Sequence, residues 1–191
     1  YPERLEKQIA FLENNQDFIL LGTSFNIVNS SGKVIKEVLF NTLAEGLYYD
    51  LIFQNMFAHS SVVFRLREVN SVGGYSESLK YAQDYDLWSK LSRIGKIWVL
   101  PDILTLWCDD PLNISNKKRK EQDLVSKGIF TNSLRLLNVE ENVVRDSYLL
   151  HILHIGCLLN APLTCISLAF ISSCELIISL RDCMGYLPIG S

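Results

Sequence analysis

The chain has 191 residues, 48% of them hydrophobic and 20% charged, so it is long enough to bury a sizeable core and too apolar to be intrinsically disordered. Eighteen Lys and Arg against 21 Asp and Glu give a net charge of −3, which leaves no overall basic field and excludes nucleic acid as an expected partner. Because Tyr1 already lies inside a helical pattern, we expect the chain to be part of a longer protein.

Residues 1–115 alternate between predicted helices and strands, which indicates an α/β fold. The first helix is expected to begin at Pro2, to end at Asn14 and to bury an apolar face of Leu5, Ile9 and Leu12. Next comes a hairpin of strands over 18–29 and 34–40, expected at the periphery of the sheet. The remaining predictions are helices over 42–53, 67–72 and 84–93, a strand over 60–64, and two short strands within 97–108 that are broken at Pro101.

Residues 116–191 are predicted to be a helical extension, with helices over 117–138, 140–159 and 163–181. No Asp, Glu, Lys or Arg occurs from Ser147 to Cys174, and this run is long enough for a membrane-spanning helix, which needs about 20 residues. Asn160 and Pro162 interrupt the run. Two packed helices are therefore favoured over insertion into a membrane, which stays the alternative.

The extension starts with the basic run Lys117–Lys120. Glu121 and Asp123 follow at once, and no aromatic residue is interleaved to stack on a base. A solvated helix start is the favoured interpretation, and contact with anionic lipid headgroups is the functional alternative. The five cysteines are odd in number, widely spaced and without a Cys-x-x-Cys pair, which predicts buried thiols in a reducing compartment.

The residues with the clearest chemical potential lie between positions 55 and 88. Asp84 and Asp86 come at the start of a predicted helix, where unpaired backbone N–H groups favour a carboxylate. Considered alone, Asp84 is interpreted as an N-cap, and His59 as a surface histidine or a hydrogen-bonded core histidine.

Five sequence blocks, in order, together resemble the C-terminal half of a family-2 glycosyltransferase of the GT-A fold. The blocks are Pro2–Gln8 (Pro-x-Arg-Leu-x-x-Gln), Ser31-Gly32-Lys33, Phe57–Ser61 (Phe-x-His-x-Ser), Val72–Tyr75 (Val-Gly-Gly-Tyr) and Ala82–Trp88. The resemblance implies that residues 1–115 form part of a Rossmann-like mixed sheet with flanking helices. Residues 116–191 would follow it as a separate helical part.

The resemblance also implies roles for individual residues. Asp84 matches the general base that takes the proton of an acceptor hydroxyl during an inverting displacement. The substrate-binding residues implied on the acceptor side are His59, Ser61, Gly73, Gly74 and Gln83.

Three departures from the family pattern bear on activity. Gln83 stands where the family has glutamate, and no histidine occurs in the stretch Trp107–Pro111. Asp110 in that stretch is a candidate ligand for a divalent metal, Mg²⁺ or Mn²⁺, which the full-length enzyme is expected to need. The nucleotide-binding half and its acidic metal-binding motif would precede Tyr1, so the chain by itself is expected to be inactive.

The resemblance thus implies an enzyme that transfers a sugar from a nucleotide-sugar donor to a glycan or lipid-linked acceptor, in the synthesis of surface polysaccharide or lipid-linked glycan. It would act in the cytoplasm at the inner face of the cell membrane, with the helical extension in peripheral contact. The alternative is a non-catalytic helical docking or membrane-associating module on a degenerate glycosyltransferase scaffold. Gln83 and the missing histidine give this alternative some weight, but the enzyme is the leading hypothesis.

Overall fold

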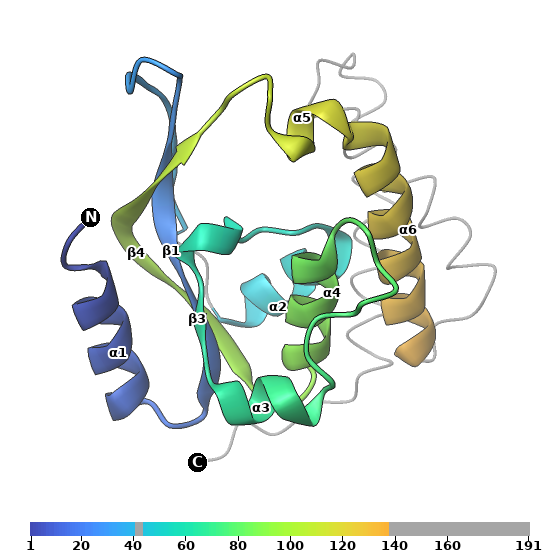
Figure 1. Cartoon of the computed structure of the whole chain (residues 1–191). Helices are drawn as coiled ribbons and strands as arrows, with labels where there is room; N and C mark the ends of the chain where they lie inside the picture. The colour runs from blue at the N-terminus through green and yellow to red at the C-terminus, as the bar shows by residue number, and fades with distance from the viewer. Residues whose placement is uncertain (41–43, 138–191) are drawn as a thin grey trace, which may run out of the picture. The chain divides into compact units, whose positions relative to one another are not determined.

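A computed structural model describes residues 1–40 and 44–137 (Figure 1). Residues Tyr1–Ser126 form one compact unit, and a second unit starts at Lys127. The first unit has the predicted α/β fold, a mixed four-stranded sheet flanked by helices. The division predicted between residues 115 and 116 stays a prediction.

Strand β1 (Phe18–Val28) is the centre of the sheet. It pairs in parallel with β4 (Lys96–Cys108) along its length, and on its other side with two antiparallel strands, β2 (Val34–Val38) and β3 (Val63–Phe64). Nearly every residue of β1 is buried, as expected for a strand that is covered on both faces. The hairpin of β1 and β2 was therefore predicted correctly. Its expected place at the periphery of the sheet is confirmed for β2, but it is wrong for β1, which lies at the centre.

Strand β4 runs through the predicted break at Pro101. The register of β1 and β4 jumps from Thr23–Leu100 to Ser24–Ile103, so two residues of β4 are left without partners on β1. Because proline has no backbone N–H for a ladder, it is placed at such bulges. The prediction that Pro101 disturbs the strand is therefore confirmed. The prediction of two separate strands is wrong, because Pro101 lies in a bulge within the single strand β4.

The helices follow the predicted order. They are α1 (Arg4–Asn14), α2 (Ala44–Phe53), α3 (Leu66–Ser71), α4 (Gln83–Leu91), α5 (Ile114–Lys117) and α6 (Arg119–Leu136). Two predictions need correction. The segment 60–64, predicted as a strand, is a short 3-10 helix η1 (His59–Ser61) followed by β3. The helix predicted over 117–138 is divided into α5 and α6. The helices predicted over 140–159 and 163–181, and the uncharged run, lie outside the described residues. Among the described helices, none combines the length and the apolar character needed to cross a membrane.

Helix α1 packs on the sheet with a different face from the one predicted. Leu12 is buried, but Leu5 is 55% exposed and Ile9 44% exposed, while Gln8 is completely buried. The Gln8 amide nitrogen donates to the carbonyl oxygens of Leu21 (3.0 Å) and Ser61 (2.9 Å). These two bonds join α1 to β1 and η1, so a polar side chain replaces leucine and isoleucine at the centre of the buried face.

The variant Gln8→Leu is expected to lower the free energy of unfolding by about 1–3 kcal/mol, because it removes both bonds and leaves buried carbonyl groups without this donor. Denaturant titration measures the loss. Gln16→Leu is the matched control, since Gln16 is exposed and bonds only to the nearby Glu13 carbonyl; its effect should stay within about 0.5 kcal/mol. Equal stability of the two variants would contradict the role of Gln8.

Candidate functional site

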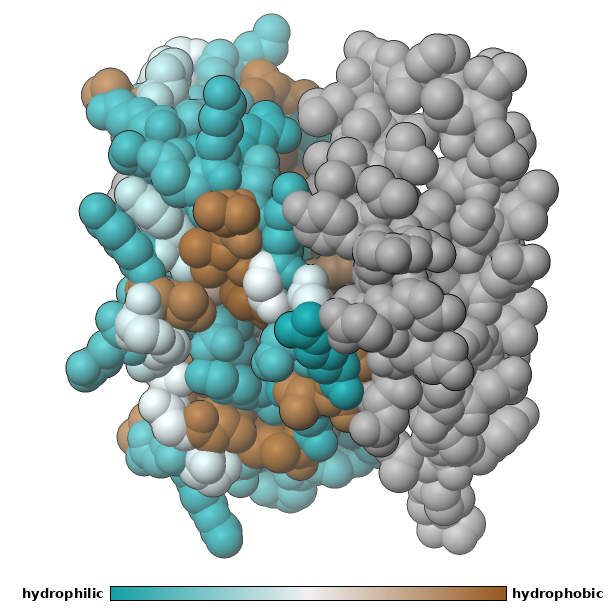
Figure 2. Space-filling model, turned by 90° about the vertical axis from the view of Figure 1, so that its right-hand side faces the viewer, coloured by the Kyte–Doolittle hydropathy of each residue, from teal (hydrophilic) through white to brown (hydrophobic). Residues whose placement is uncertain are grey.

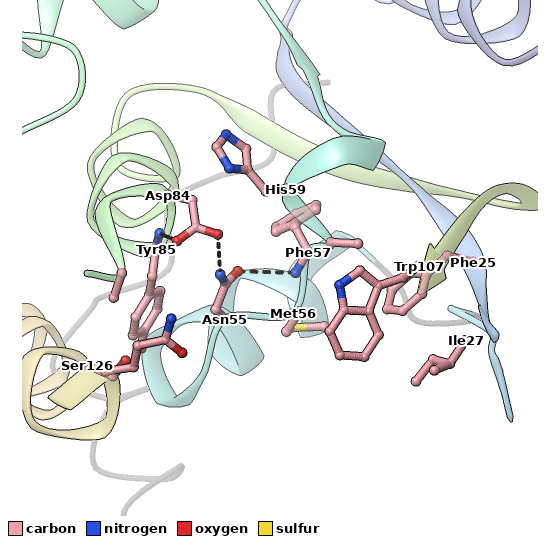
Figure 3. Close-up of a pocket in the computed structure, with 13 residues that line it drawn as sticks. Phe25, Ile27, Asn55, Met56, Phe57, His59, Asp84, Tyr85, Trp107 and Ser126 are labelled. Atoms are coloured by element: carbon pink, nitrogen blue, oxygen red, sulfur yellow. Dashed lines mark hydrogen bonds between the residues drawn. The ribbon is translucent and has the colours of Figure 1, made fainter. Parts of the chain in front are cut away.

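A cleft of about 350 Å³ lies beside the start of α4 (Figure 3). The lining comes from β1, from the loop after α2 and the start of η1, from the N-cap and first turn of α4, from the end of β4 and from the first half of α6. One part of the lining is apolar and the other is polar or charged. The lining residues are Phe25, Ile27, Asn55, Met56, Phe57, Ala58, His59, Ala82, Asp84, Tyr85, Trp107, Gln122 and Ser126.

Asp84 is held at both of its carboxylate oxygens. Oδ1 accepts the backbone N–H of Tyr85 (2.9 Å), and Oδ2 accepts the side-chain amide of Asn55 (2.9 Å), as the dashed lines in Figure 3 show. Ala82 is the N-cap residue of α4, and Asp84 is the second residue of the helix, so the interpretation of Asp84 as an N-cap is wrong. Its place in the first turn still favours a negative charge, because the helix dipole is positive there.

The turn that leads into α4 has an unusual backbone. Ala82 has φ +52° and ψ 28°, and within the described residues it is the only non-glycine residue with positive φ. Such a conformation costs a residue with a Cβ atom about 1–3 kcal/mol and is concentrated at functional sites. Because Ala82 immediately precedes Gln83 and Asp84, this turn sets the direction in which the charged end of α4 enters the cleft.

His59 and Tyr75 form a polar pair above a buried aromatic residue. His59 Nε2 and the Tyr75 hydroxyl are 2.9 Å apart, and both rings pack on Trp88 at centroid distances of 5.9 and 6.3 Å. Partial burial, together with the negative charge of Asp84, raises the pKa of Tyr75. The Tyr75 hydroxyl therefore stays protonated at neutral pH and remains a hydrogen-bond donor near Asp84.

Tyr85, the residue after Asp84, anchors the same turn from below. Its ring is 1% exposed, and its hydroxyl donates to the carbonyl of Ile52 at 2.8 Å. Burial raises the pKa of this phenol far above its usual range. Tyr85 thus ties the first turn of α4 to the end of α2.

Besides Gln83, three predicted substrate-binding residues do not belong to the cleft lining. Ser61 is completely buried, its hydroxyl donates to the Ala58 carbonyl (2.7 Å), and its own carbonyl accepts the Gln8 amide. Gly73 and Gly74 have φ of +84° and +66° and end α3, as the sequence predicted, because glycine adopts positive φ at little cost. The positions of all three indicate a structural function, and a substrate contact at any of them stays a prediction.

Gln83 and Asp110 are both bonded locally. The exposed Gln83 side chain donates to the Leu79 carbonyl (2.6 Å), and Asp110 Oδ1 accepts the backbone N–H of Leu112 (2.7 Å). In the part of the chain that the structure describes, no three His, Cys, Asp or Glu residues are grouped closely enough to hold a metal. A role of Asp110 as a metal ligand therefore stays a prediction.

The cleft brings His59 and Asp84 together and adds residues that the sequence analysis did not single out. Asn55, Trp107 and Ser126 belong to three segments far apart in the chain, and all three line the cleft. Nothing in the linear sequence pairs Asn55 with Asp84, which is 29 residues away. The only indication of Asn55 was its position, because it is the first residue of the stretch 55–88, which contains the candidate catalytic and substrate-binding residues His59 and Asp84.

No family model matches the chain, but it is similar to several proteins that are named glycosyltransferases. It is 33% identical over 105 residues to the amylovoran biosynthesis glycosyltransferase AmsE of Erwinia amylovora. The matched segment covers 54% of this chain and 38% of AmsE. It is 25% identical over 171 residues to an uncharacterized glycosyltransferase of Haemophilus influenzae, covering 81% of this chain and 52% of that protein. For the putative glycosyltransferase EpsE of Bacillus subtilis the identity is 26% over 97 residues, covering 50% of this chain and 34% of EpsE.

All three relatives are named as glycosyltransferases. The matched segments correspond to between 34% and 52% of the relatives' length, so the chain spans about half of such a protein or less. Over half or more of its own length, this chain is similar to glycosyltransferases.

Proposed function

We propose that the chain is the acceptor-side part of an inverting family-2 glycosyltransferase of the GT-A fold. The enzyme transfers a sugar from a nucleotide-sugar donor to a hydroxyl group of a glycan or lipid-linked acceptor. The observation that carries the proposal is Asp84, a carboxylate at the first turn of α4 that lines a cleft and is held at both oxygens.

Asp84 is the general base of this reaction. The acceptor hydroxyl loses its proton to the carboxylate as its oxygen bonds to the anomeric carbon. The bond from that carbon to the nucleoside diphosphate breaks at the same time, and the diphosphate leaves with the electron pair. Because a carboxylate oxygen accepts more than one hydrogen bond, the bonds to Asn55 and Tyr85 leave Asp84 able to accept from a hydroxyl at about 3 Å.

The other predicted participants remain parts of the proposal. His59 lines the same cleft and is proposed to contact the acceptor, together with its partner Tyr75. The requirement of the full-length protein for Mg²⁺ or Mn²⁺ stays a prediction. Within the described part of the chain, no three His, Cys, Asp or Glu residues are grouped closely enough to hold the ion.

The name of AmsE, which refers to amylovoran biosynthesis, supports a function in the synthesis of a surface polysaccharide. The proposal is tested by assaying the full-length protein and its Asp84→Asn variant with a panel of nucleotide sugars and hydroxyl acceptors. Transfer by the wild type with inverted anomeric configuration, and its loss in the variant, would support the proposal. Retained configuration in the product would overturn the inverting mechanism.

We also propose that the protein acts in the cytoplasm, in peripheral contact with the inner face of the cell membrane. Lys117, Arg119 and Lys120 are exposed around the junction of α5 and α6, and Lys118 pairs with Glu121 at 2.7 Å. In the upper coloured part of the face drawn in Figure 2, hydrophilic residues predominate and some hydrophobic residues lie among them. A basic residue near an anionic leaflet contributes about 1 kcal/mol to binding.

The full-length protein is expected to float with vesicles that contain anionic lipid at low salt, and less of it should float at 0.5 M salt because salt screens the attraction. The double variant Lys117→Glu/Lys120→Glu should lower the floating fraction several-fold. Lys33→Glu/Lys36→Glu in the β1–β2 hairpin is the charge-matched control and should float like the wild type. If the wild-type protein stays in the soluble fraction while the anionic vesicles float, the membrane proposal is wrong.

A further inference from the structure

The contact between Asn55 and Asp84 carries an inference about how the base is held. Asn55 lies two residues after α2 ends, and its Nδ2 donates to Asp84 Oδ2 at 2.9 Å. Figure 3 shows the two side chains pointing toward each other across the cleft wall. The bond therefore joins the base on α4 to a different segment of the chain.

A second hydrogen bond fixes which end of the Asn55 amide faces Asp84. The backbone N–H of Phe57 donates to Asn55 Oδ1 at 3.2 Å, which occupies the amide oxygen as an acceptor. A carboxylate has no hydrogen to donate, so the amide NH₂ is the group that matches it. Phe57 is itself buried, with its ring 6.4 Å from that of Trp88, and this anchors Asn55 to the core.

The two bonds on Asp84 differ in what they constrain. The bond from the Tyr85 N–H comes from the neighbouring residue of the same helix, and it moves with the Asp84 backbone. The bond from Asn55 comes from outside α4 and fixes the second oxygen. Together they define the plane of the carboxylate, which sets the direction from which a hydroxyl proton is accepted.

We propose that Asn55 is a positioning residue, which orients the Asp84 carboxylate through Nδ2 while Phe57 holds its own amide in place. The inference rests on the proposed function of Asp84 as general base. Loss of the Asn55 side chain should therefore lower the rate of the transfer step and leave the affinity for the nucleotide-sugar donor unchanged.

The variant Asn55→Ala in the full-length protein is expected to lower kcat about 10- to 100-fold, the effect of one lost hydrogen bond to a charged group. The KM for the donor should stay within about twofold, because Asn55 acts through Asp84. Gln54→Ala is the matched control, since Gln54 is the exposed neighbouring residue and should leave kcat unchanged. A kcat of Asn55→Ala equal to that of Gln54→Ala overturns the proposal.

Asn55→Asp is the second variant, because it retains the acceptor for the Phe57 N–H and so preserves the loop. It replaces the donor with a carboxylate opposite Asp84, where like charges repel. We expect a loss of kcat at least as large as in Asn55→Ala, with a melting temperature close to that of wild type. Wild-type kcat in Asn55→Asp would show that Asp84 needs no donor at this position.

A double-mutant cycle separates this inference from the proposed function. In the Asp84→Asn background, Asn55→Ala should change the residual rate, followed with labelled donor, by less than about twofold. A full further loss there would show that Asn55 acts independently of Asp84 and would overturn the inference. Undiminished transfer by Asp84→Asn alone would instead refute the general base, whatever Asn55 does.

Discussion

Replacing Asp84 with asparagine in the full-length protein is expected to lower kcat for sugar transfer by about 10²–10⁴-fold, the usual contribution of a general base. Asparagine retains the shape of the side chain but cannot take the proton of an acceptor hydroxyl. Its NH₂ group also replaces one of the two carboxylate oxygens, so either the Asn55 amide or the Tyr85 N–H then faces a donor in place of an acceptor. Transfer of labelled sugar measures the rate, and calorimetric titration with the donor should give an affinity close to that of wild type.

Asp86→Asn is the matched control for this experiment. Asp86 lies on the same helix, but its carboxylate forms an ion pair with Lys90 (2.6 Å) one turn further on, and it does not belong to the cleft lining. This variant should therefore retain most of the transfer activity. If Asp84→Asn stays within about threefold of wild type and Asp86→Asn is inactive, Asp86 is the base.

Removing the ring of Trp88 is expected to have the largest effect on stability. Trp88 is completely buried and lies under the site, with the rings of His59, Phe64, Tyr75 and Phe57 at centroid distances of 5.9–6.4 Å. Trp88→Ala should cost about 3–5 kcal/mol of unfolding free energy, because it leaves a cavity and removes these contacts. At about 2–4 °C per kcal/mol for a chain of this size, the melting temperature should fall by roughly 6–20 °C.

Trp88→Phe is the control that separates packing from the indole N–H. The described residues provide no hydrogen-bond acceptor for Trp88 Nε1, so phenylalanine removes a buried unpaired donor while retaining an aromatic ring. We expect it to cost clearly less than Trp88→Ala. Thermal unfolding of both variants is the measurement, and equal losses would show that the ring contacts contribute little.

The local elements of the fold were predictable because their causes lie within a few residues. The Asn29 side chain accepts the backbone N–H groups of Ser31 and Lys33 and so closes the hairpin turn. Glycine at positions 73 and 74 supplies the positive φ that ends α3. Turn and cap chemistry of this kind acts over two to four positions, which is the range that a sequence pattern reports.

The buried face of α1 was not predictable, because its cause is distant in the chain. Hydrophobic spacing pointed to Leu5 and Ile9, which are exposed, while Gln8 is buried by bonds to carbonyl groups 13 and 53 residues away. The central position of β1 has the same origin, since three other strands pair with it. Amphipathic periodicity predicts that a face is buried, but the partner across the interface selects which one.

The candidate site, too, was predictable from the sequence only in part. From local sequence alone, Asp84 was interpreted as an N-cap and His59 as a surface or core histidine, and only the resemblance of the sequence blocks to a glycosyltransferase family implied functional roles for them. Only the tertiary structure brings them to one cleft with Asn55 and Trp107, and only it places Ser61 in the core. Residue type determines which chemistry a side chain can perform, whereas hydrogen bonds between residues as distant as 55 and 84 decide the geometry in which it is performed.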